Sequence, residues 1–144
     1  MSAASSKNVA VQKGTVQADV DIPKRQAACK AAGKPDINVL VDADQAKVTS
    51  AVLTGKADAM LVDLPPAIAA VESTNGTLEL LGEQYDSGPY GYVLTKDDAG
   101  SAFGAAIVEA LKQLKADGTY DQILTKWKTQ QGAISDFAVN PTVS

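Results

Sequence analysis

Two short polar segments contain the residues whose chemistry best suits ligand binding. The first, Gly14-Thr15-Val16-Gln17, lies between an apolar run and a helical pattern. A strand-to-helix turn directs backbone N–H groups and the positive end of the helix at an anion. Gly14 lets a ligand approach the backbone, and Thr15 adds a hydroxyl donor. A plain turn with Thr15 as the helix N-cap explains the same residues, so both alternatives stay open.

The second segment is the end of an apolar run, where the chain places a carboxylate. Asp63 follows the apolar run 59–62, where it can pair with a cation, bind a metal or accept a phosphoryl group. It can equally cap the helix expected from Leu64. Asp42, Asp44 and Gln45 follow another apolar run, and there capping is the favoured interpretation.

The composition excludes several kinds of active site. The 144 residues include no His, one cysteine (Cys29) and one arginine (Arg25). Without His there is no side chain that ordinarily titrates near neutral pH, no triad built on it and no imidazole ligand for zinc. One Arg allows at most one bidentate clamp for a carboxylate or phosphate. We therefore expect a binding module without metal or cofactor, and no enzyme.

The hydrophobic content and the net charge further restrict the class of protein. Hydrophobic residues make up 45% and charged residues 21% of the chain, as in globular proteins. The net charge is −4 with no basic cluster, which disfavours a nucleic-acid partner. Residues 1–6 have neither the basic nor the apolar region of a signal peptide, so a flexible leader is expected over residues 1–7.

Alternating strand and helix patterns must position these residues. We expect strands over residues 8–12, 37–41, 57–62, 78–81 and 90–95, and helices over 16–32, 44–54, 64–73, 101–116 and 120–130. Pro23 is expected to break or start the first helix. This order predicts an α/β fold: a doubly wound, mostly parallel sheet of about five strands with a C-terminal helical pair. Ligands bind such sheets outside the carboxyl ends of the strands, where both polar segments lie.

Two doubly wound families of this size do not fit. Asp63 and Lys96 superficially match the phosphorylated Asp and the Lys of response-regulator receivers. Receivers also need an acidic pair after the first strand, where this chain has Gln12-Lys13. Flavodoxins need a loop rich in Ser, Thr and Gly after that strand, and Gly14-Thr15 is too short a match.

A third comparison fits over residues 7–130. Four segments follow one another in the order and spacing of a known family: KNVAVQKGTVQ (7–17), LTGKADAMLVD (53–63), YGYVLTK (90–96), and Leu111 followed by DGTYDQILTKW (117–127). With these segments the chain resembles the polar amino-acid-binding proteins (family 3 solute-binding proteins) that serve ABC transporters.

The resemblance implies a two-lobed protein that closes on an amino acid. Residues 8–94 would form the second ligand-binding lobe, a type II periplasmic-binding-protein lobe. Residues 95–131 would be helices belonging to the first lobe, and residues 132–144 a tail. Most of the first lobe would be absent, so this truncated form is expected to bind weakly.

The resemblance also assigns site residues. Thr15, with the backbone around Gly14 and Val16, would hold the α-carboxylate of a zwitterionic amino acid. Asp63 would pair with its α-ammonium group, and Gln45 would add a polar contact. The clamping Arg of the family belongs to the absent part, and Arg25 is no substitute because it lies within the first helix.

The expected function is extracytoplasmic amino-acid binding for uptake through the membrane permease of an ABC transporter. The parent family is periplasmic or extracellular and lipoprotein-anchored. Two alternatives stay open: an enzyme on the same scaffold, similar to cyclohexadienyl dehydratase and using Asp63 or a nearby Glu as the acid, or a partner module with a vestigial site. Apolar faces on the last two helices predict self-association, through Phe103, Ile107, Leu111, Leu114, Ile123, Leu124 and Trp127.

Overall fold

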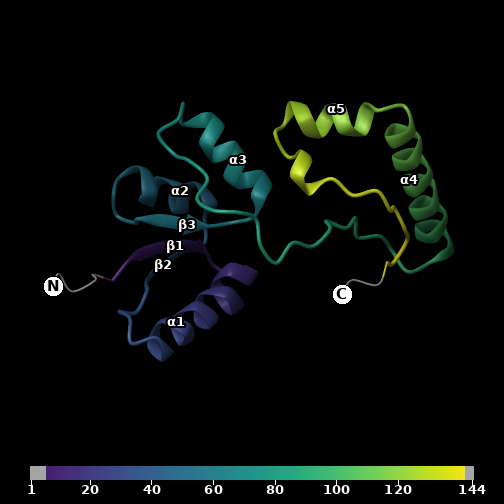
Figure 1. The fold of residues 1–144 in the computed structure, drawn as a ribbon. Coiled ribbons are helices and arrows are strands. Elements are labelled where there is room, and N and C mark those ends of the chain that lie inside the picture. The colour runs from purple at the N-terminus through teal and green to yellow at the C-terminus, as the bar shows by residue number, and fades with distance from the viewer. Residues whose placement is uncertain (1–5, 142–144) are drawn as a thin grey trace. The chain divides into compact units, whose positions relative to one another are not determined.

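The computed structural model describes residues 6–141 (Figure 1). These residues divide into two compact units, one ending at Leu80 and the other beginning at Leu81. None of the described helices combines the length and the apolar composition that crossing a membrane requires.

The first unit is built on a parallel sheet of three strands in the order β2–β1–β3. The strands are β1 (Asn8–Gln12), β2 (Asn38–Asp42) and β3 (Ala59–Leu61). Val9 is paired with Val39 on one side and with Ala59 on the other, so β1 is the central strand. The predicted α/β class with a parallel sheet is therefore confirmed.

Successive residues of β1 are buried on opposite faces of the sheet. Ala10 packs with Val48 of α2 (Gln45–Leu53) and with Ala57, all within a small apolar core. Val11, whose side chain must point the other way, is completely buried as well. Figure 1 shows α1 (Ile22–Ala31) on the side of the sheet opposite α2.

The segment predicted as a helix over residues 16–32 is helical, but its first part is a π-helix and not an α-helix. A π-helical turn, η1 (Gln17–Asp21), leads directly into α1. The N–H of Ile22 donates to the carbonyl of Gln17, five residues earlier. Pro23 lies in the first turn of α1, where its missing N–H costs nothing. The proline therefore starts α1 without ending the helical path.

The next two helices of this unit agree with the sequence pattern. In α2 the Asp44 carboxylate accepts a hydrogen bond from the Ala46 N–H at 2.8 Å, which confirms its predicted capping role. Gly55 follows this helix with φ of +70°, a conformation that favours glycine. The third helix, α3 (Leu64–Ser73), begins directly after Asp63.

The predicted fourth and fifth strands are wrong. Residues 78–81 and 90–95 form no strand, so the described sheet has three strands instead of about five. Leu81 is 88% exposed and Val93 is 97% exposed. Apolar residues of this kind favour a strand only where a neighbouring strand and a covered face receive them, and these two segments have neither.

The second unit contains the predicted helical pair. α4 (Asp98–Ala116) and α5 (Thr119–Lys126) are joined at Gly118, which has φ of +82°, and a short 3₁₀ turn, η2 (Gln130–Gly132), follows. Phe137 is buried and packs edge-on against Tyr120, with ring centroids 5.3 Å apart. The segment after η2 thus packs on the helices, a contact that no sequence pattern indicated.

The start of α4 depends on a close approach that only glycine permits. The Asp97 carboxylate accepts hydrogen bonds from the Gly100 N–H at 2.7 Å and from the Thr95 hydroxyl at 2.8 Å. The Gly100 bond, with the Thr95 bond, holds the pKa of Asp97 below its ordinary value. A Cβ at position 100 would overlap the Thr95 carbonyl oxygen.

We predict that Gly100→Ala lowers the free energy of unfolding of the second unit by about 1–3 kcal/mol, because the added methyl group displaces Thr95 and breaks the cap. The change is measured by chemical denaturation followed by helical circular dichroism. Gly91→Ala is the matched control, since a Cβ there meets nothing within 4 Å. Equal effects of the two substitutions would contradict this account of the cap.

Candidate functional site

The carboxyl ends of the three strands bring the predicted polar segments together. Because the strands are parallel and adjacent, the turn after β1, the start of α2 after β2 and the start of α3 after β3 lie at one edge of the sheet. A pocket of about 300 Å³ opens there. Its lining is made of Gln12, Thr15, Gln17, Gln45, Leu61, Val62, Asp63 and Pro66.

Three of the five predicted site residues line this pocket. They are Thr15, Gln45 and Asp63, which come from the three different strand ends. Gly14 and Val16 flank Thr15 in the chain without lining the pocket, and the Val16 side chain is exposed. For these two residues only the backbone could serve the site.

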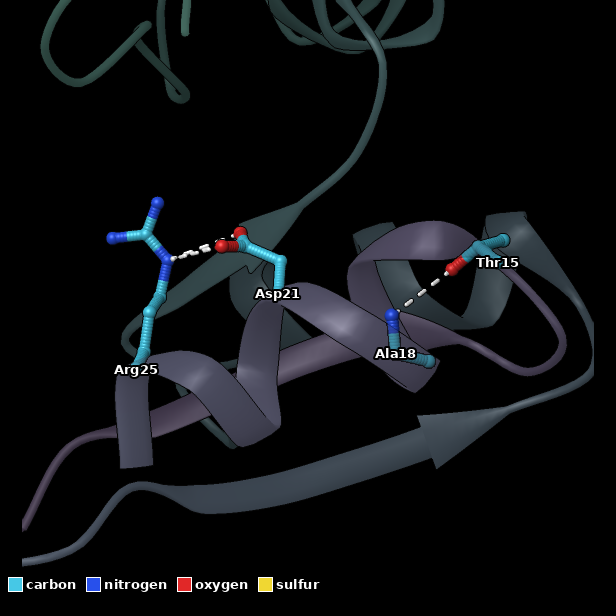
Figure 2. Close-up of polar contacts among 4 residues, drawn as sticks. All are labelled: Thr15, Ala18, Asp21 and Arg25. Carbon is cyan, nitrogen blue, oxygen red and sulfur yellow. Dashed lines mark hydrogen bonds and ion pairs between the residues drawn. The ribbon is translucent and has the colours of Figure 1, made fainter. Parts of the chain in front are cut away.

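The turn after β1 uses the Thr15 hydroxyl for its own structure. Gly14 has φ of +73°, which reverses the chain after the strand. The Thr15 hydroxyl donates to the Gln12 carbonyl at 2.8 Å and accepts from the Ala18 N–H at 3.3 Å, the second contact being drawn in Figure 2. The hydroxyl thus closes the turn and caps the first helical turn. A ligand anion at this turn would meet backbone N–H groups.

Asp63 occupies the N-cap position of α3, yet its side chain makes no capping hydrogen bond. Its Oδ1 instead accepts from the Gln17 Nε2 at 2.6 Å. This contact joins the segment after β1 to the segment after β3. The carboxylate therefore lies at the pocket, where it can receive a cationic group.

Gln45 supplies a second acceptor. Its Nε2 faces the Met60 sulfur at 3.7 Å, which also receives the Thr49 hydroxyl at 3.6 Å. The Gln45 Oε1 is buried and has no hydrogen-bond partner among the described residues. A buried oxygen without a donor is costly. A ligand N–H would relieve that cost.

The residues that line the pocket include no Lys or Arg. Arg25 lies in α1, where its Nε contacts both Asp21 carboxylate oxygens at 3.0–3.1 Å, as Figure 2 shows. Within residues 6–141, no three His, Cys, Asp or Glu side chains group together as metal ligands. The described chemistry is therefore that of hydrogen bonding and one carboxylate.

Sequence reasoning assigned no role to Gln12 or Gln17. The Gln12 Nε2 donates to the Ala43 carbonyl at 3.1 Å and so ties the end of β1 to the segment after β2. Both glutamines could have been identified from their positions in the sequence, since one ends β1 and the other begins the next helical segment. The signal for Gln17 was its place in the predicted turn motif.

A parallel α/β unit with polar side chains gathered at its strand ends is the arrangement of a small-molecule-binding domain. The chain is 30% identical over 132 residues to the arginine-binding protein ArgT of Corynebacterium glutamicum, covering 92% of this chain and 42% of that protein. It is 31% identical over 93 residues to the ABC transporter glutamine-binding protein GlnH of Bacillus subtilis, covering 65% of this chain and 33% of GlnH.

A third relative is the putative amino-acid ABC transporter-binding protein PatH of Vibrio harveyi, 30% identical over 76 residues, which are 53% of this chain and 31% of PatH. The chain thus spans less than half the length of these relatives. The three matches confirm the resemblance to amino-acid solute-binding proteins of ABC transporters, of which the chain matches a part. No protein-family model and no solved structure matches the chain.

The contrast between two aspartates at helix starts gives a stability test. We predict that Asp44→Ala lowers the free energy of unfolding of the first unit by about 1 kcal/mol, because it removes a cap. Asp63→Ala should cost less, because its carboxylate makes no capping bond. Thermal or urea unfolding of the two variants measures both changes. A larger loss for Asp63→Ala would mean that the carboxylate is chiefly structural.

Proposed function

We propose that this chain contributes one ligand-binding lobe to an amino-acid-binding protein that serves an ABC transporter. The observation that carries the proposal is the meeting of Thr15, Gln45 and Asp63 in one strand-end pocket. The names of the relatives support it, since all three are binding proteins and none is named as an enzyme.

The two ends of a zwitterion suit two parts of the pocket. The α-ammonium group pairs with the Asp63 carboxylate, and the buried Oε1 of Gln45 adds an acceptor for a ligand N–H. The α-carboxylate lies against the backbone N–H groups around Gly14, Thr15 and Val16, at the start of the helix. Because the Thr15 hydroxyl is engaged in the turn, the backbone provides most of this anion contact.

The rest of the binding protein would supply what this pocket lacks. We assign residues 8–94 to the second lobe, residues 95–131 to helices of the first lobe and residues 132–144 to a C-terminal segment. Closure of two lobes would bring a clamping cation to the α-carboxylate, since no cation lines the described pocket. Binding by this chain alone is therefore weak. The whole protein acts outside the cytoplasm and delivers its ligand to the membrane permease.

Catalysis on the same scaffold is less well supported. An enzyme related to cyclohexadienyl dehydratase needs a general acid at the ligand, and Asp63 is the only carboxylate among the lining residues. Its Oδ1 accepts a hydrogen bond from the Gln17 amide, and no second acidic side chain lines the pocket to complete an acid–base pair. Titration of the chain with amino acids distinguishes a vestigial site from a working one.

L-Arginine and L-glutamine, the amino acids in the names of two relatives, are the first probes. We predict weak, saturable binding of at least one of them in calorimetric titrations of the wild-type chain. Asp63→Asn should weaken it at least tenfold, because the amide keeps the shape and removes the charge that pairs with the ammonium group. Asp36→Asn, an exposed change outside the pocket, is the control. Unchanged binding by Asp63→Asn would show that the carboxylate does not pair with the ligand.

The second unit exposes apolar side chains that the proposed first lobe would cover. Phe103 is 60% exposed, Ile123 47% and Trp127 66%. We predict that the wild-type chain self-associates through these helices, with a sedimentation coefficient that rises with concentration. The double variant Phe103→Lys/Trp127→Lys should sediment as a monomer, and Lys112→Gln should behave as wild type. A wild-type chain that is monomeric at every concentration would refute self-association.

A further inference from the structure

The first turn of α3 cannot be capped by its own N-cap residue. A capping carboxylate accepts from the N–H of the second or third helical residue. In α3, which begins at Leu64, those residues are Pro65 and Pro66, and neither has an N–H. Two of the other described helices that follow an aspartate N-cap are capped by it: Asp44 accepts from Ala46 and Asp97 accepts from Gly100. Asp21, before α1, likewise makes no side-chain capping bond, and there too a proline, Pro23, is the second helical residue. Pro65 and Pro66 thus release the Asp63 carboxylate from capping.

A neutral donor holds the released carboxylate at the pocket. The Gln17 Nε2 lies 2.6 Å from the Asp63 Oδ1, although the two residues are 46 positions apart in the chain. Gln17 is half-buried at the start of η1, and both residues line the pocket. An amide donor fixes the direction of the carboxylate and leaves its negative charge intact, whereas a lysine here would neutralise it.

We propose that Gln17 is a positioning residue: it holds the Asp63 carboxylate toward the ligand, while Pro65 and Pro66 remove the competing helix cap. The part of this inference that concerns the ligand rests on the proposed function. The part that concerns the orientation of Asp63 is a property of the chain without ligand, and it can be measured separately.

The orientation is tested by the side-chain amide signals of Gln17 in ¹H–¹⁵N spectra of the ligand-free chain. Asp63→Ala should shift these signals toward those of a solvated glutamine. Pro65→Ala, an exposed change that restores one capping N–H without touching the pocket lining, should shift them in the same direction. Asp44→Ala is the control and should leave them in place. If Gln17 signals do not move in Asp63→Ala, the positioning role is overturned.

The effect on the ligand is tested by titrating L-arginine and L-glutamine into Gln17→Met. The variant keeps a side chain of similar length and removes the donor, so affinity should fall about fivefold, the effect of one hydrogen bond. Gln113→Met is the matched control, because Gln113 also donates to a carboxylate, that of Glu109, on the exposed surface of α4. The melting temperatures of both variants should stay close to that of the wild type.

A double-mutant cycle separates positioning from a merely structural role. In the Asp63→Asn background, Gln17→Met should cause no further loss of affinity, because the charge that Gln17 positions is already gone. An equal fivefold loss in both backgrounds would overturn the proposal. If the wild type binds neither probe while the Gln17 signals shift as expected, the proposed function fails and the positioning of Asp63 stands.

Discussion

Pairing of β1 with a parallel strand on each side is the constraint on which the first unit depends. It buries Ala10 and Val11 on the two faces of the sheet. It also fixes where the pocket can be, since the ends of three parallel strands must come out at the same edge. Residues as distant in the sequence as Thr15, Gln45 and Asp63 reach one pocket for this reason. The sheet is small, so a loss of register in β1 would remove the core and the pocket together.

The sequence pattern predicted those elements whose formation depends mainly on residues close together in the chain. The turn at Gly14, the cap at Asp44 and the existence of the helical pair could be read from residue types and spacing. The end of the second helix could not: it was expected at residue 130, and α5 ends at Lys126. Residues 78–81 and 90–95 were misassigned because strand formation depends on a partner strand, and single-sequence patterns carry no information about that partner. The role of Asp63 was left open between capping and binding. Pro65 and Pro66 exclude the usual capping bond, since prolines at the second and third helical positions lack the N–H donors that a cap needs.

The pocket concentrates hydrogen-bond acceptors and offers no cation. Asp63 and the buried Oε1 of Gln45 suit the nitrogen end of an amino acid, and the backbone after Gly14 suits the carboxylate end. Favourable burial of an ammonium–carboxylate pair needs exclusion of water, which an open pocket on one unit does not provide. If the pocket binds an amino acid as proposed, a second surface must close over it to exclude water. On that proposal the chain alone is expected to bind weakly.

The most direct test of the central claim, that the strand-end pocket receives an amino acid, is a ¹H–¹⁵N titration of the wild-type chain with L-arginine or L-glutamine. The account predicts shifts that saturate and are confined to the pocket: the amides of residues 14–17, Gln45, Val62 and Asp63. Shifts that instead cluster around the second hollow between β2 and α2, lined by Leu40, Lys47 and Thr54, or no shifts with either amino acid, would contradict it.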